Sequence, residues 1–150
     1  VIVGDGPDRR RLNRLARQLD LDVKFIGAFP HRQLPALLAS AQVVALPVRT
    51  RWAGLNPEGL GLSFLEAAAC ARPVLVGRSG GAPETVLDGT TGYVLDPGDV
   101  PGWARRLDEL LGDPGRADAL GAAGRAYVGP HFGTAAVARR LRQALDLPLT

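Results

Sequence analysis

Val43-Val44-Ala45-Leu46-Pro47 begins the stretch of sequence that decides the fold, a short apolar run ended by a proline. A polar connection extends from Pro47 to about Gly59, and apolar residues at helical spacing follow from Leu60 to Ala71. The apolar run predicts a buried strand, and the order strand, loop, helix is typical of one unit of a parallel sheet.

The same alternation continues on both sides of this stretch. The expected strands are Val1–Val3, Val23–Ile26, Val43–Leu46, Pro73–Val76 and Tyr93–Leu95. The expected helices are Asp8–Leu19, Leu34–Ala41, Leu60–Ala71, Ala82–Leu87, Asp99–Leu111, Arg116–Val128 and Thr134–Leu145. We therefore predict an α/β fold, a Rossmann-like parallel sheet with helices on both faces.

The sequence also predicts how three of these helices begin, end or pack. Asp5 or Asp8 is expected to cap the first helix, because an aspartate side chain can accept from the free amide groups there. Gly129-Pro130 is expected to separate the last two helices. The inward stripe of the central helix is expected to consist of Leu62, Leu65, Ala69 and Cys70.

Ligands of such folds bind beyond the carboxyl ends of the strands. Three loops follow strands there, at Gly27–His31, Pro47–Gly59 and Gly77–Glu84. The middle loop is the longest connection in the first hundred residues, and long connections inside compact domains are often functional. We therefore expect the main ligand site at Pro47–Gly59.

The end of that loop combines two acids with two glycines. Gly59 and Gly61 allow a ligand to approach the backbone, and the following helix end offers amide groups to a diphosphate. Glu58 precedes this end and Glu66 follows it, so both can accept from hydroxyl groups on either side of a diphosphate. This pattern suits a nucleotide-sugar, although a solvated loop acid and a helix-surface acid would give the same two residues.

Two other glycine loops carry weaker signals. A dinucleotide fingerprint needs a third glycine where Arg9 stands in Gly4–Arg9, so NAD binding is disfavoured and a tight turn is favoured. The backbone of Ser79–Glu84 can contribute donors to a sugar or phosphate. A helix start with Pro83 in its first turn is the simpler interpretation.

Composition excludes several other classes. His31 and His131 stand far apart, and Asp20-Leu21-Asp22 lies at the wrong end of the sheet, so no metal site is expected. Cys70, the single cysteine, is expected in the core rather than as a nucleophile, and it fits a reducing cytosol.

The basic residues, 18 in number with Lys24 as the only lysine, look scattered among acids. They have no interleaved aromatics, so we expect no nucleic-acid partner. The net charge of +3 permits peripheral membrane contact without requiring it. No apolar run is long enough to span a bilayer.

Several motifs in fixed order resemble a known family. They are Val3-Gly4-Asp5-Gly6-Pro7, Val23-Lys24-Phe25-Ile26-Gly27, Glu58-x7-Glu66, Arg72-Pro73-Val74, Gly80-Gly81-Ala82-Pro83-Glu84, and Asp88-Gly89-Thr90-Thr91-Gly92-Tyr93-Val94 leading to Asp96-Pro97-Gly98-Asp99. Together they cover about residues 1–128 and resemble the C-terminal domain of retaining GT-B glycosyltransferases of family 4. The stretch from Arg49 to Glu84 is similar to actinobacterial GDP-mannose-dependent mannosyltransferases that act on phosphatidylinositol mannosides.

The resemblance implies roles for named residues. It implies that Glu58 contacts the donor hexose and is the residue on which catalysis depends, and that Glu66 contacts the ribose. The backbone of Gly59, Leu60, Gly61 and Leu62 would hold the distal phosphate. Phe25, Gly27 and Phe29 would form the rim beside the nucleobase. One relative uses Asp and Lys on guanine there, whereas this chain has Ala28-Phe29-Pro30-His31.

The expected activity is retaining transfer of a hexose, mannose from GDP-mannose, to a glycolipid or glycan acceptor, with no metal or other cofactor. The alternatives are a UDP-sugar-dependent family 4 transferase and a non-catalytic nucleotide-binding or scaffold domain. An enzyme is expected in the cytoplasm, peripheral on the inner face of the plasma membrane.

The domain organisation expected from the resemblance is incomplete. Residues 1–150 would form the nucleotide-sugar-binding domain, truncated at its N-terminus, with a crossover helix in residues 132–150. The N-terminal acceptor domain and the Arg and Lys residues that neutralise the diphosphate would lie upstream. The isolated fragment is therefore expected to be inactive.

Overall fold

The computed structural model describes residues 1–50 and 54–146. The chain divides into two compact units, Val1–Ala36 and Leu37–Thr150. In the described part of the chain, no helix is long and apolar enough to cross a membrane.

The first unit contains a small parallel sheet. Its elements are β1 (Ile2–Val3), α1 (Arg9–Gln18), β2 (Phe25–Gly27) and the 3-10 helix η1 (His31–Gln33). β1 pairs with β2 in parallel, and the amide of Gly4 donates to the carbonyl of Gly27 at 2.7 Å. The expected strands are therefore present. The side chains of Ile2 and Val3 are 41% and 43% exposed, so the burial expected of an apolar strand is absent in β1.

The expected aspartate cap of α1 is wrong. Asp8 occupies the position before the helix, but its side chain makes no capping hydrogen bond. Its carboxylate instead accepts from the Nε of Arg11 at 3.1 Å. The Asp5 carboxylate accepts from the amide of Gly6 at 3.0 Å and pairs with Arg9 at 3.4 Å. Both carboxylates therefore bind neighbouring arginine side chains, and neither caps the helix.

The second unit is built on a three-stranded sheet in the order β3-β4-β5, with all pairs parallel. Its strands are β3 (Val44–Leu46), β4 (Val74–Gly77) and β5 (Gly92–Leu95). Its helices are α3 (Leu62–Ala69), the 3-10 helix η3 (Ala82–Thr85), α4 (Val100–Gly112), α5 (Pro114–Phe132) and α6 (Thr134–Ala144), and α2 (Leu34–Ser40) crosses the boundary between the units. The predicted parallel α/β fold is confirmed.

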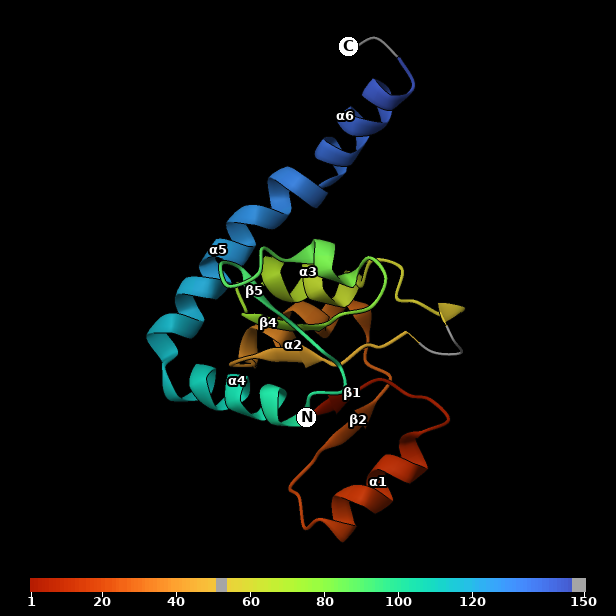
Figure 1. Cartoon of the computed structure of the whole chain (residues 1–150), viewed down its shortest axis with the longest axis vertical. Helices are drawn as coiled ribbons and strands as arrows, with labels where there is room; N and C mark the ends of the chain where they lie inside the picture. Colours follow the sequence, from red (N-terminus) through yellow and green to blue (C-terminus); the bar gives the residue numbers. More distant parts are fainter. Residues whose placement is uncertain (51–53, 147–150) are drawn as a thin grey trace. The chain divides into compact units, whose positions relative to one another are not determined.

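Helices cover both faces of this sheet, as predicted. Successive side chains of β4 point to opposite faces. Val74 and Val76 pack with Phe64 and Ala67 of α3, whereas Leu75 packs in a second cluster with residues of β5, α4 and α5. Figure 1 shows β4 and β5 between α3 and α4. The middle strand is therefore buried on both sides.

The predicted inward stripe of α3 is partly wrong. Leu65 is buried as expected, but Leu62 is 66% exposed and Ala69 is also exposed. The buried residues of α3 are Phe64, Leu65, Ala67 and Ala68. The helix packs against both β4 and α5, so its buried face is broader than a single stripe. Cys70, expected in the core, is half-buried at the helix end.

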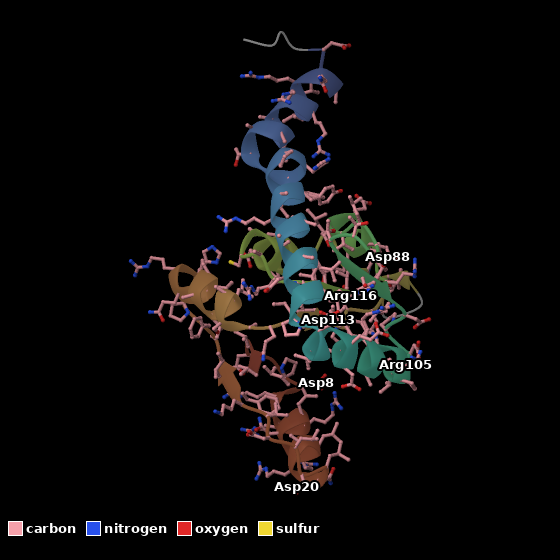
Figure 2. All side chains as sticks on the ribbon, turned by 90° about the vertical axis from the view of Figure 1, so that its left-hand side faces the viewer. Asp8, Asp20, Asp88, Arg105, Asp113 and Arg116 are labelled. Carbon is pink, nitrogen blue, oxygen red and sulfur yellow. The ribbon has the colours of Figure 1, made fainter. Side chains whose placement is uncertain are left out.

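Two predicted helix boundaries also differ. Asp113 alone separates α4 from α5, and its Oδ1 accepts from the amide of Arg116 at 2.9 Å; both residues are labelled in Figure 2. The predicted break at Gly129-Pro130 is wrong, because α5 continues through Pro130 to Phe132. Pro130 cannot donate to the carbonyl of Ala126 and its ring crowds that carbonyl, but only His131 and Phe132 follow it in the helix. The ring of Tyr127 stacks on that of His131 over the same turn, with centroids 4.2 Å apart.

Candidate functional site

The loops that follow β3 and β4 meet beyond the carboxyl ends of these strands. A Cβ atom on Gly77, the last residue of β4, would collide with the backbone of Val48 in the loop after β3. The side chain of Ser79 lies against Glu58 in the same region. The structure thus brings together two of the loops that the sequence predicted to share a rim.

The backbone of Glu58 is held from both sides. Its amide donates to the Oγ of Ser79 at 3.1 Å, and its carbonyl accepts from the amide of Gly81 at 3.1 Å. Both partners lie in the loop between β4 and η3. Glu58 is half-buried. Because both partners belong to a neighbouring loop, that loop fixes the position of the Glu58 backbone.

Gly80 and Gly81 allow this contact. A Cβ atom on Gly80 would collide with the carbonyl oxygen of Glu58, and one on Gly81 with that of Gly59. The amides of Gly81, Ala82 and Glu84 already donate within the protein. The idea that this turn supplies ligand donors is therefore wrong for these three amides. The predicted helix start is confirmed, with Pro83 in the first turn of η3.

A cavity of about 260 Å³ lies beside Glu58. Its lining residues are Pro47, Val48, Arg49, Asn56, Pro57 and Glu58. Arg49 brings a positive charge to this cavity, while Arg51, the other arginine of the loop, lies outside the described residues. An acid and a base at one small cavity suit a ligand that carries hydroxyl groups and negative charge.

The amino end of α3 follows directly. Gly61 takes the position before the helix with φ 78°, a left-handed conformation that favours glycine, and a Cβ atom there would also collide with the ring of Phe64. No described side chain caps this end, and its first turn contains no acid. The amide of Phe64 already donates to the carbonyl of Gly61 at 3.0 Å. The other first amides of a helix lack intrahelical acceptors and attract anions. Leu62, the first helical residue, is exposed, so solvent reaches this end.

The remaining predicted residues divide between the two units. Leu60 is half-buried beside exposed Gly59, and Glu66 is half-buried in the second turn of α3. Gly59, Leu60, Gly61, Leu62 and Glu66 therefore adjoin Glu58 along one continuous segment.

The predicted base-side residues belong to the first unit. Phe25 and Phe29 are half-buried, and the carbonyl of Phe25 accepts from the guanidinium of Arg9 at 3.3 Å. Gly27 is buried with φ 67°.

The structure also reveals a basic surface on α1. A shallow hollow of about 700 Å³ is lined by Arg9, Arg10, Asn13, Arg14, Arg17 and Gln18. The view that the arginines are scattered among acids is wrong here, because Arg10, Arg14 and Arg17 have no acidic partner in the described ranges. The sequence signal was present, since these arginines recur at helical spacing on one face.

Only the margin of this basic surface is neutralised. Arg9 pairs with Asp5, and Arg11, which lies outside the hollow, pairs with Asp8. The hydrogen bond with Asp8 and the attraction between the charges raise the pKa of Arg11 above its ordinary value. Residues 1–50 and 54–146 contain no group of three His, Cys, Asp or Glu side chains that would hold a metal ion.

The chain is similar in sequence and in fold to known proteins. The family model described as "Glycosyl transferases group 1" matches residues 1–127. The chain belongs to this family. A "GDP-mannose-dependent alpha-(1-6)-phosphatidylinositol monomannoside mannosyltransferase" of Mycolicibacterium smegmatis is 53% identical over 127 residues, which are 83% of this chain and 33% of the relative. The chain thus spans about a third of that relative's length.

Two solved structures share the fold. The Anabaena protein HepE, in complex with UDP and glucose, is 25% identical with a TM-score of 0.82 and is matched over 96% of this chain and 39% of its own. The C-terminal domain of a group 1 family protein from Francisella tularensis, at 23% identity, has a TM-score of 0.67 over 85% of this chain and 65% of its own. The fold is that of the C-terminal half of a GT-B glycosyltransferase.

Proposed function

We propose that this domain binds the donor in a GDP-mannose-dependent mannosyltransferase that transfers mannose, with retention, to a phosphatidylinositol mannoside. The observation that carries the proposal is the placement of Glu58. Two hydrogen bonds from a neighbouring loop fix its backbone at a cavity, directly before the uncapped end of α3. The name and 53% identity of the mycolicibacterial relative support the choice of mannose and lipid.

In this proposal each part of the site takes one part of the donor. The backbone at Gly59–Leu62 binds the distal phosphate, because helix amino ends attract anions. Glu58 accepts from hydroxyl groups of the hexose, and Glu66 accepts from the ribose. Phe25, Gly27 and Phe29 form the base-side rim.

The reaction follows from this arrangement. The bond between the anomeric carbon and the diphosphate oxygen breaks, and the acceptor oxygen bonds to the same face of that carbon. The acceptor proton passes to the leaving diphosphate. Stabilisation of the leaving group by the end of α3 and by cations outside this segment supplies most of the catalysis. Glu58 anchors the sugar rather than forming a covalent bond.

The acceptor and the diphosphate-neutralising cations belong to the rest of the protein in this proposal. A segment that spans a third of the relative is expected to bind the donor without turnover. Residues 132–150 would cross towards the acceptor domain. Within this range α6 exposes Val137 and Leu141, and Leu145 directly after the helix is also exposed, so apolar side chains recur at every fourth position.

We also propose peripheral contact between α1 and the anionic inner face of the plasma membrane, where a lipid acceptor would be met. The support is the unpaired charge of Arg10, Arg14 and Arg17. Charge reversal of these three arginines should abolish flotation with phosphatidylglycerol vesicles. Reversal of the exposed Arg105, Arg125 and Arg139 on other helices is the matched control. Equal loss in both variants would contradict a specific surface on α1.

Calorimetry on the full-length protein tests the donor. GDP-mannose should bind, NAD should not, and Glu66→Ala should weaken GDP-mannose binding. The complex of Anabaena HepE with UDP and glucose favours one alternative, a UDP-sugar donor. Preference for UDP-glucose in the titration would establish that alternative. No binding of any of the three would favour a non-catalytic scaffold.

A further inference from the structure

Ser79, Thr85 and Thr91 are buried hydroxyl side chains of the second unit, and Ser79 differs from the other two. The Oγ1 of Thr85 donates to the carbonyl of Ala82 at 2.7 Å, and the Oγ1 of Thr91 accepts from the amide of Leu87 at 2.8 Å. Each of these bonds closes a local turn. The Ser79 hydroxyl, in a residue only 3% exposed, instead contacts Glu58 and Thr50, which lie 21 and 29 residues away.

The hydroxyl of Ser79 can serve both contacts at once. A hydroxyl has one proton and two lone pairs, so it can accept from the Glu58 amide while exchanging a hydrogen bond with Thr50. The distance from the Ser79 Oγ to the Thr50 Oγ1 is 2.9 Å. Ser79 therefore joins the start of the loop after β3, the end of that loop and the loop after β4.

The surroundings leave Glu58 little freedom to move. The Gly81 amide holds the carbonyl side of Glu58, while Gly80 and Gly81 press against the carbonyl oxygens of Glu58 and Gly59. The amide side depends on Ser79. Loss of that bond would let the backbone of Glu58 rotate about its remaining contact, and the carboxylate would turn with it.

We propose that Ser79 is a positioning residue, which fixes the direction of the Glu58 carboxylate towards the hexose of the donor, and that Thr50 supports it. This inference rests on the role proposed above for Glu58. Ser79 touches no substrate in this account and acts through Glu58 alone. Its effect must therefore appear on ligands that carry the hexose and be absent from ligands that lack it.

Calorimetry of the full-length protein with GDP-mannose and with GDP tests this point. Ser79→Ala should weaken GDP-mannose binding by about tenfold, which is the scale of one lost hydrogen bond, and leave GDP binding unchanged within about twofold. Thr91→Val is the matched control, because it also removes a hydroxyl that is 3% exposed and accepts a backbone amide. It should leave both affinities unchanged.

The outcomes separate this inference from the proposed function. Failure of the unaltered protein to bind GDP-mannose contradicts the proposed donor. If the unaltered protein binds but Ser79→Ala weakens GDP and GDP-mannose equally, or weakens neither, only the positioning role is overturned. If Ser79→Ala does not fold, Thr50→Val removes the outer hydroxyl. It should give a selective loss of about threefold for GDP-mannose, and no selective loss would overturn the role.

Discussion

Each unit of the chain has a loop in which two glycines lie close together, and the two loops use glycine for different reasons. In the first unit, Gly4 adopts φ 110°, and Cβ atoms on Gly4 and Gly6 would meet nothing within 4 Å. In the second unit, Cβ atoms on Gly80 and Gly81 would collide with backbone oxygens of the Glu58 loop. The first loop needs glycine for the backbone conformation at Gly4. The second loop also has a positive φ, 49° at Gly80, and in addition needs the close approach of two segments.

This difference indicates where binding chemistry can be built. The Gly4–Gly6 loop turns the chain from β1 into α1, and its surroundings are open. The Gly80-Gly81 loop holds an acid in place against a cavity. The glycine pattern in the sequence is similar, so the distinction comes from what packs against each loop.

Removal of the Glu58 carboxylate, which the second loop holds, is expected to have the largest effect, a loss of activity. Glu58→Ala in the full-length protein should lower kcat/KM by about 100-fold or more, because hydrogen bonds to a charged group contribute about 1.5–3 kcal/mol each. Steady-state kinetics with GDP-mannose measures it. Glu84→Ala, which removes an exposed acid from the neighbouring turn, is the control. Near-normal turnover of Glu58→Ala would show that the loop holds a residue of no catalytic importance.

The next largest effect is expected when a side chain is introduced at Gly81, where the two loops are in close contact. Gly81→Ala should lower the free energy of unfolding by about 3 kcal/mol, at the upper end of the range for overpacking, because the new methyl group would collide with the rigid backbone of Gly59. Denaturant unfolding monitored by circular dichroism measures this change. A loss below about 0.5 kcal/mol would mean that the two loops separate easily. The loop after β4 would then hold the Glu58 backbone only weakly.

Apolar runs were sufficient to predict most of the strands. Val44–Leu46 and Val74–Gly77 lie within one residue of their predicted bounds, because buried parallel strands need continuous apolar sequence. The rim between the loops after these strands follows from strand direction alone. Ser79 could not be identified as a partner of Glu58, since the contact spans 21 residues and one serine carries no signal of its own.

Helix details were harder to predict, because they depend on tertiary contacts. Leu62 was expected inside, yet α3 packs on two elements and buries Phe64 instead. Pro130 was expected to end α5, but the helix continues through it to Phe132, and the stacked Tyr127 and His131 rings lie across that turn. Local sequence gives a preference for a helix face or a helix end. Tertiary packing determines which of several alternatives of similar energy forms.

Gly61 and Gly4 allow the effect of backbone conformation to be distinguished from the effect of a close neighbour. Gly61 and Gly4 both have positive φ, but only Gly61 has a neighbour, the Phe64 ring, where a Cβ atom would lie. Gly61→Ala should cost about 2 kcal/mol, more than Gly4→Ala, because left-handed strain and ring displacement add. Denaturant unfolding of both variants measures the difference. Equal costs would show that Phe64 adjusts freely and that conformation alone requires glycine at Gly61.

The smallest effect is expected at Gly6, and it is the most discriminating test of the first loop. Gly6 has no positive φ and nothing within 4 Å of its Cβ position, so Gly6→Ala should change the free energy of unfolding by less than about 0.5 kcal/mol. If the loop is only a turn, GDP-mannose affinity in calorimetry should also stay within about twofold. An unchanged stability with a strong loss of donor affinity would mean that the open space beside Gly6 is filled by ligand. The first loop would then need glycine for the close approach of a ligand, as the second needs it for the close approach of a neighbouring segment.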